Sequence, residues 1–181
     1  MSGNTHMKHY LVLAIGNTLL SDDGVGAQVV EYLKRNADEL PADVRLVDGG
    51  TLSFSLATEL DDLAGLIVVD ASKFHAQPGA FRCFINGEMD EQLQGGGRSV
   101  HEVGLSDLLD IARLTGQLPQ RTALVGIEPA ATDWGEALSP AVQAAVPEAA
   151  ALVTGLINRW RCDAAGEHCH ASQPTPLEAV S

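Results

Sequence analysis

The sequence predicts a single α/β domain built on a mostly parallel β-sheet. Short apolar runs alternate with segments of helical periodicity, which is the pattern of strand–helix–strand units with right-handed crossovers. The apolar runs are continuous rather than alternating, as expected of strands that are covered on both faces. The chain has 181 residues, 45% of them hydrophobic, so it can bury the core of one domain.

The first half of the chain contains three predicted strands. The first strand is expected over residues 10–15, and a helix over 25–35 follows it because valine and leucine recur there at helical spacing. A second strand over 43–47 comes next. A short amphipathic helix over 52–62 then leads to a third strand over 63–72. Helical crossovers between these strands indicate that they run parallel.

The fourth strand departs from this pattern. Only a short segment containing Pro78 separates the third strand from the apolar run 80–85. A parallel crossover needs about a dozen residues or more, so the fourth strand is predicted to be antiparallel to its neighbours. The polar, glycine-rich stretch 86–100 is expected to be a mobile surface loop. A helix over 104–115 and a fifth strand over 121–128 follow.

The last predicted helix begins with Ser139 as N-cap and Pro140 in the first turn. From about residue 162 the composition turns to alanine, serine, proline and glutamate, which is typical of a disordered tail. The sequence therefore predicts a disordered N-terminus over 1–9, one domain over 10–161 and a disordered tail over 162–181.

The acidic composition excludes several classes of function. The formal net charge is −13, from 24 acidic and 11 basic residues, so neither nucleic acid nor an anionic membrane surface is an expected partner. No apolar run approaches the roughly 18–20 residues of a membrane span, and the polar start is not expected to be a signal peptide. Three scattered cysteines predict a reducing cytoplasm. Metal cations, small molecules and proteins remain as partners.

Acidic side chains follow three of the predicted strands. Asp22 and Asp23 come after the first strand, Asp48 after the second, and Asp70 at the end of the third. In open α/β sheets, ligands bind beyond the carboxyl ends of the strands, so these acids are expected at one exposed edge. His101, just before a predicted helix, could reach the same edge. Two carboxylates and an imidazole suit a divalent cation, and clustered carboxylates could also act as acid and base in hydrolysis.

Each of these residues also has an ordinary structural interpretation. Asp22 could be a helix N-cap and Asp23 a first-turn acid that interacts with the helix dipole. Asp48 is followed by two glycines and could belong to an ordinary turn, as could Asp70. His101 could be a solvated histidine. Their convergence on one edge favours a functional site, but the pattern alone does not choose between the two interpretations.

Other candidate sites are weaker. The segment "GNTLLSDDGVG" lacks the glycine spacing of a dinucleotide fingerprint, and the chain contains neither a phosphate-binding P-loop motif nor the serine elbow of α/β hydrolases. "EHCH" at 167–170, with Cys162, could bind metal but lies in the predicted tail. Cys83 lies within a predicted strand and is interpreted as a core thiol.

Several motifs, in order and at consistent spacing, carry a resemblance to a known family. Over residues 10–157 the chain resembles the hydrogenase maturation peptidases, in the segments "LAIGNTLLSDDGVG", "DGGT", "LIVVDA", a histidine followed by "GLSDLL", and "LVGIEPA". The resemblance implies a three-layer α/β/α fold with a five-stranded, mostly parallel sheet. It thus agrees with the antiparallel fourth strand expected above.

The resemblance also implies roles for individual residues. Its metal-binding set corresponds to Asp23, Asp70 and His101. Relatives often have glutamate at the position of Asp23, so distances to a metal are expected to differ here. Asp48 corresponds to an acid beside the cleft, and Asp23, Asp48 and Asp70 are the implied catalytic residues. Asp22 is then expected to cap or support the first loop.

The implied activity is that of an endopeptidase, of aspartic or metal-dependent type. It would remove the C-terminal extension of the [NiFe] hydrogenase large-subunit precursor after nickel insertion, using the nickel carried by that precursor for recognition. Zinc or cadmium could occupy the same ligands in vitro. Two alternatives from other classes are a non-enzymatic nickel-binding assembly chaperone and a nucleoside phosphorylase-like enzyme. The lack of basic residues at the candidate edge disfavours the second alternative.

Overall fold

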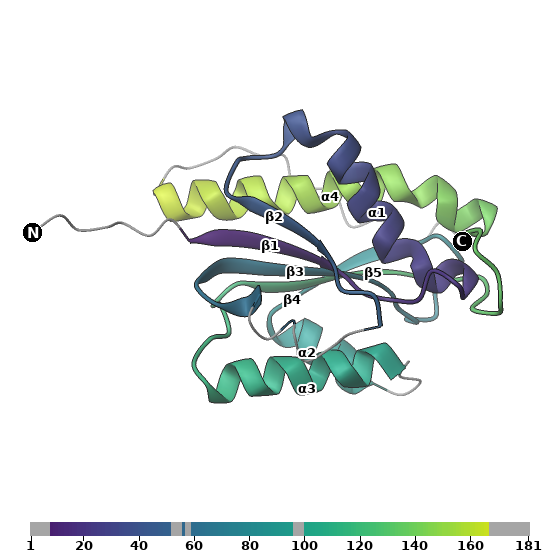
Figure 1. The fold of residues 1–181 in the computed structure, drawn as a ribbon, viewed down its shortest axis with the longest axis horizontal. Coiled ribbons are helices and arrows are strands. Elements are labelled where there is room, and N and C mark those ends of the chain that lie inside the picture. Colours follow the sequence, from purple (N-terminus) through teal and green to yellow (C-terminus); the bar gives the residue numbers. More distant parts are fainter. Residues whose placement is uncertain (1–7, 52–55, 57–58, 96–99, 167–181) are drawn as a thin grey trace, which may run out of the picture.

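The computed structural model describes residues 8–51, 56, 59–95 and 100–166. A five-stranded sheet lies between two helical layers, with α1 and α4 on one face and α2 and α3 on the other (Figure 1). The three-layer α/β/α architecture predicted from the sequence is confirmed. The predicted disorder of the N-terminus falls outside the described residues, apart from Lys8 and His9.

The sheet contains four parallel strands and one antiparallel strand. The strands are β1 (His9–Ala14), β2 (Val44–Asp48), β3 (Leu63–Ala71), β4 (Phe81–Ile85) and β5 (Thr122–Ile127). Their order across the sheet is β2-β1-β3-β5-β4. Strand β4 pairs antiparallel with β5 at the edge of the sheet, as the short connection after β3 requires.

Four α-helices and two short 3₁₀ helices surround the sheet in the described part of the chain. They are η1 (Ser21–Gly24), α1 (Val25–Arg35), η2 (Ala37–Glu39), α2 (Gly87–Gln94), α3 (Val100–Leu114) and α4 (Pro140–Ala165). Most of the helix predicted over 52–62 lies outside the described residues. Leu56 and Leu60, within that range, are buried in the core on the α3 side.

Alternation along the central strands builds two separate cores. On β1, Leu11 and Leu13 point into the core beneath α2 and α3, whereas Tyr10 and Val12 point into the core beneath α1 and α4. Strands β3 and β5 divide their side chains in the same way. Both faces of the sheet are therefore apolar, which explains the continuous hydrophobic runs in the sequence.

The prediction of a loop over 86–100 was wrong for most of this range, and residues 96–99 lie outside the described part. Residues 87–94 form helix α2, which buries Met89 and Leu93 against the sheet. These two apolar residues are four positions apart and share one helix face, so a mostly polar segment still has a face to bury. Helix α3 also begins earlier than predicted, at Val100.

Helix α4 is longer than predicted. It continues to Ala165 and ends at Gly166, whose φ of 71° is the left-handed conformation that commonly closes helices. The boundary predicted at residue 162 was therefore wrong, and residues 167–181 lie outside the described part. Trp160 stacks on Tyr10 with ring centroids 6.3 Å apart, which fixes the last turns of α4 over the start of β1.

By length and composition α4 could cross a membrane. The apolar side chains that give it this hydropathy include Val142, Val146, Val153 and Ile157, which are buried against the sheet and α1. Their spacing of four and seven residues places them on one face of the helix. The packing of α4 as a core helix accounts for this composition. The sequence analysis expected no segment to approach a membrane span, so α4 differs from that expectation in its length and hydropathy.

Candidate active site

The candidate site lies where the order of the strands reverses. The chain passes from β1 through α1 to β2 on one side, and then returns to β3 on the other side of β1. In the sheet register, Ala14 at the end of β1 pairs with Asp48 on β2 and with Val69 on β3, next to Asp70. Such a switch point is the usual ligand site of open α/β sheets, so Asp48 and Asp70 flank it from either side.

Gly16 is the point where the segments carrying the predicted acids meet. Its N–H donates to the carbonyl oxygen of Gly50, 2.9 Å away, in the turn after Asp48. A Cβ at this position would overlap the carbonyl oxygen of Asp23 and lie 3.7 Å from Oδ1 of Asp70. The φ of Gly16 is 124°, a conformation that side chains rarely adopt. Glycine is required here for both reasons.

Asp23 and Asp70 are both buried beside this glycine. Asp23 is 5% exposed and lies in η1, where its Oδ2 accepts a hydrogen bond of 2.7 Å from the Asn17 N–H. Asp70 is 1% exposed. It follows Leu66 and Val68 in the alternation of β3, which places it on the α2 and α3 side of the sheet. The expectation that these carboxylates lie at an exposed edge was wrong, because the surrounding loops cover them.

Asp48 lies at the same end of the sheet but differs in its surroundings. It is exposed, and its Oδ1 accepts a hydrogen bond of 3.0 Å from the N–H of Gly50. The turn interpretation of Asp48 is thus correct for one carboxylate oxygen. The same turn contacts Gly16, so Asp48 remains next to the segment that holds the two buried acids.

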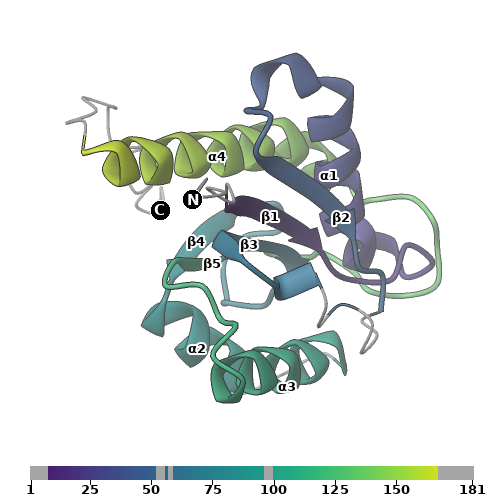
Figure 2. The same ribbon diagram turned by 60° about the vertical axis from the view of Figure 1, so that its left-hand side comes forward.

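His101 lies in the first turn of α3 rather than before a helix. Because α3 leads into β5, which is parallel to β3, it begins at the carboxyl end of the sheet, as η1 does (Figures 1 and 2). Helix α3 also covers the face of the sheet toward which Asp70 points. The backbone therefore places His101 in the helical layer that Asp70 faces, while its side chain is outside the described part. Among described side chains, no group of three His, Cys, Asp or Glu is arranged to hold a metal.

Asp22 is not a helix cap. It is fully buried and joins the first loop to the loop after β5. Its Oδ2 accepts hydrogen bonds from the N–H groups of Ala130 and Ala131, at 2.8 and 3.1 Å. Its Oδ1 accepts one from Ser139, at 2.6 Å. Burial by itself raises the pKa of Asp22, but these three hydrogen bonds outweigh it and hold the pKa below its ordinary value. The predicted role in supporting a loop is confirmed.

Gly26, which follows the acid pair, allows a close approach between α1 and the sheet. A Cβ on Gly26 would overlap the carbonyl oxygen of Val69 and lie 2.7 Å from that of Ile15. Helix α1 therefore passes directly over the ends of β1 and β3 because position 26 has no side chain. This close approach fixes η1, and with it Asp23, against the switch point.

Glu128 is a buried acid that the sequence analysis missed. Its Oε2 accepts hydrogen bonds from the N–H groups of Phe74 and Ala76, at 2.8 and 3.1 Å. It thereby fixes the loop that follows Asp70 on β3. An acid at the end of a buried apolar strand was the signal used for Asp70, and the same signal is present in the segment "ALVGIE".

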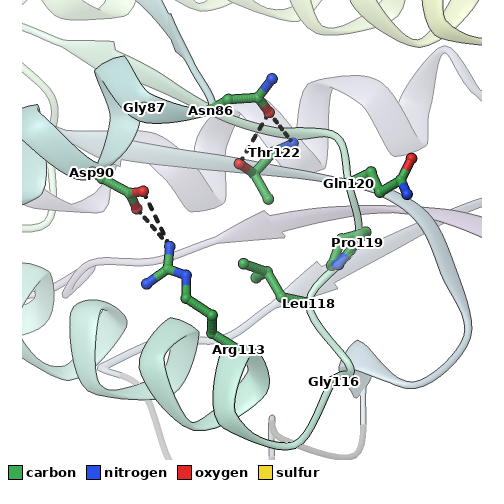
Figure 3. A pocket seen from close by; sticks show the side chains of 9 residues that line it. All are labelled: Asn86, Gly87, Asp90, Arg113, Gly116, Leu118, Pro119, Gln120 and Thr122. Atoms are coloured by element: carbon green, nitrogen blue, oxygen red, sulfur yellow. Dashed lines mark hydrogen bonds and ion pairs between the residues drawn. The ribbon is translucent and has the colours of Figure 1, made fainter.

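A pocket of about 350 Å³ lies at the other end of the sheet, away from all four predicted site residues. It is lined by the start of α2, the end of α3 and the segment that leads into β5, and Figure 3 shows two pairs of polar contacts among its lining residues. Arg113 donates to both carboxylate oxygens of Asp90, at 3.0 and 3.1 Å. Asn86 accepts from the N–H of Thr122 at 3.0 Å. These pairs fasten α2 to α3 and β4 to β5.

The fold and the site together define an α/β protein with buried carboxylates at the switch point of its sheet. Comparison with known proteins makes this specific: the chain belongs to the hydrogenase maturation protease family (HycI), which matches residues 27–156. It is therefore a peptidase that acts in hydrogenase maturation.

Relatives in sequence and in structure agree with this assignment. The chain is 35% identical over 151 residues to the hydrogenase expression/formation protein HupD of Rhodobacter capsulatus, covering 83% of this chain and 71% of HupD. It is 36% identical over 141 residues to the hydrogenase 2 maturation protease of Escherichia coli K12, covering 77% and 84% of the two chains. The hydrogenase maturating endopeptidase HybD of E. coli superposes with a TM-score of 0.77 at 30% identity, covering 83% and 93%.

Proposed function

We propose that this peptidase removes the C-terminal extension of the [NiFe] hydrogenase large-subunit precursor after nickel insertion. The observation that carries the proposal is the burial of Asp23 and Asp70 around Gly16 at the switch point of a hydrogenase maturation protease. The cytoplasm is the proposed location, because the three cysteines are few and scattered. Neither nucleic acid nor a membrane is a proposed partner.

Nickel enters this proposal as cargo of the substrate. Carboxylate and imidazole groups suit divalent transition metals, and we assign Asp23, Asp70 and His101 as the groups that contact the nickel of the precursor. Two carboxylates buried near each other repel, and a divalent cation between them relieves that repulsion. Zinc or cadmium would occupy the same ligands in vitro for this reason. A precursor without nickel lacks this attraction, which makes recognition dependent on nickel insertion.

Hydrolysis of a peptide bond needs a group that takes a proton from the attacking water. With Asp23 and Asp70 engaged by nickel, Asp48 is the carboxylate of the three that remains exposed at the same end of the sheet. We therefore assign proton transfer to Asp48 and substrate placement to Asp23 and Asp70, which is an aspartic type of peptidase. The scissile bond lies next to the nickel in this arrangement.

Mass spectrometry of the precursor before and after incubation tests the proposal. The wild type should shorten the nickel-loaded precursor and leave the nickel-free precursor intact. Asp23→Asn and Asp70→Asn should reduce cleavage by about a hundredfold or more, with no loss of thermal stability, because each replacement conserves shape and removes a buried charge. Binding of nickel-loaded precursor without any shortened product would instead identify a nickel-binding chaperone. Normal cleavage by either variant would remove that residue from the mechanism.

A further inference from the structure

Two large apolar side chains are exposed on neighbouring loops beside the candidate site. Trp134, in the loop between β5 and α4, is 82% exposed, and Leu19, in the loop between β1 and η1, is 46% exposed. Tryptophan is strongly enriched among the residues that dominate the energy of protein interfaces. The pair is therefore a candidate contact surface rather than an ordinary part of the solvated surface.

Backbone hydrogen bonds join the two loops. The N–H of Gly135 donates to the carbonyl oxygen of Leu19 at 3.0 Å, and the N–H of Ser21 donates to the carbonyl oxygen of Gly135 at 2.6 Å. Ser21 also donates through its hydroxyl to the carbonyl oxygen of Asp133, at 3.0 Å. Figures 1 and 2 show the two loops side by side at the carboxyl end of the sheet. Leu19 and Trp134 thus belong to one surface.

This surface is held in place and is continuous with the candidate site. Asp22 holds both ends of the loop that carries Trp134, through Ala130, Ala131 and Ser139. On the other loop, the N–H of Leu19 donates to Oδ1 of Asn17, whose own N–H donates to Asp23. A surface ordered before binding loses little conformational entropy when a partner docks, so its apolar area contributes more fully to affinity.

Charge identifies the chemistry of the partner. Asp133 and Glu136 are exposed on either side of Trp134, in a protein whose net charge is −13. An apolar side chain with a basic neighbour complements this surface, because the apolar group packs on the indole ring. The cation is attracted both by the acids and by the face of the ring.

We propose that Trp134 and Leu19 form the docking surface for the precursor polypeptide next to its scissile bond, and that this segment presents an apolar residue beside a basic one. This inference rests on the proposed function, since it places the substrate of that same site. The nickel contacts would select the state of the precursor, while the Trp134 surface would orient its chain.

The test measures binding and cleavage separately. Calorimetric titration of nickel-loaded precursor into the Asp48→Asn protein, which keeps the assigned nickel ligands, gives Kd without requiring turnover. Trp134→Ala in that background should raise Kd by about tenfold or more, and Leu19→Ser should raise it by a smaller factor. In the cleaving protein, Trp134→Ala should raise KM by a similar factor and leave kcat within about twofold, because docking precedes chemistry.

The matched control is Leu114→Ala. Leu114 is 88% exposed at the end of α3, at the opposite end of the sheet, so its truncation should change neither Kd nor KM. Trp134→Phe, which keeps an aromatic face, should restore most of the affinity.

Unchanged Kd and KM in Trp134→Ala would overturn the inference and leave the proposed cleavage by the wild type unaffected. Absence of cleavage by the wild type, with binding still dependent on Trp134, would overturn the proposed function and support the docking surface. If the precursor bound neither the wild type nor any of the variants, both the proposed function and the docking surface would be overturned.

Discussion

At the scale of single residues, the adjacent acids Asp22 and Asp23 have different surroundings. Asp22 satisfies three backbone N–H groups and ties two loops together, whereas Asp23 lies beside Asp70 at the switch point. Neighbouring carboxylates are expected to repel each other, and in this fold the two bind different partners: Asp22 accepts from the loop after β5, and Asp23 accepts from Asn17. The first is a structural anchor, and the second is the acid that we assign to the nickel-bearing substrate.

Replacement of Asp22 should lower the stability of the protein more than replacement of Asp23 does. Asp22→Ala leaves three partly buried N–H groups without their acceptor, so we expect a loss of about 1–3 kcal/mol in the free energy of unfolding, measured by urea denaturation. Because folding lowers the pKa of Asp22, its contribution is present above the ordinary carboxyl range near pH 4 and is lost as the pH falls toward the folded pKa. The difference between wild type and Asp22→Ala should therefore shrink in acid. A constant difference down to pH 2 would contradict the assignment.

At the scale of elements, the site depends on how closely backbone segments approach one another. The end of β1, the turn after β2 and η1 all meet at Gly16. Helix α1 crosses the strand ends at Gly26 for the same reason. Glycines in these positions allow the close backbone approaches that place the carboxylates.

Gly16→Ala should prevent assembly of this end of the sheet. The added Cβ overlaps the Asp23 carbonyl and the φ of 124° is unsuited to alanine, so we expect a loss of about 3 kcal/mol or more together with loss of cleavage. Gly50→Ala is the matched control, because its φ is 51° and no atom of the described residues lies within 4 Å of an added Cβ. It should cost about 1 kcal/mol. Equal midpoints in thermal melts of the two variants would show that crowding at Gly16 is not decisive.

The observed end of α4 changes where the chain can be shortened. Truncation after Gly166 should leave the melting temperature unchanged, because α4 and its left-handed closing residue are kept. Truncation after Arg161 removes the last helical residues and the carboxylate of Asp163, which lies 4.0 Å from Arg121. That ion pair is exposed, so we expect a loss of no more than about 1 kcal/mol. A large loss of activity on truncation after Gly166 would show that "EHCH" contributes to function.

At the scale of the whole molecule, the proposed nickel contacts come from both helical layers. Asp23 precedes α1 on one face of the sheet, and His101 begins α3 on the other, with Asp70 on the strand between them. The site is therefore complete only when both layers are packed on the sheet. A substrate bound there contacts the two layers together.

Metal titration tests whether His101 completes the set. Zinc should shift the ring resonances of His101 in NMR spectra and leave the other histidines as internal controls. A neutral imidazole is needed for ligation, so zinc affinity should fall on acidification. His101→Ala should weaken zinc binding and remove this step in its pH dependence. Ring signals that stay unchanged at zinc saturation would exclude His101 as a ligand.

The sequence by itself determined the order of the five strands along the chain, the antiparallel fourth strand and the carboxyl end of the sheet as the place of the acids. These features follow from periodicity and connection length, which are local. Only the tertiary structure decided that Asp22 anchors a loop more than a hundred residues away and that Asp23 and Asp70 are buried. It also showed that residues 87–94 form a helix. Burial and hydrogen-bond partners depend on which distant segments pack together, and no local pattern contains that information.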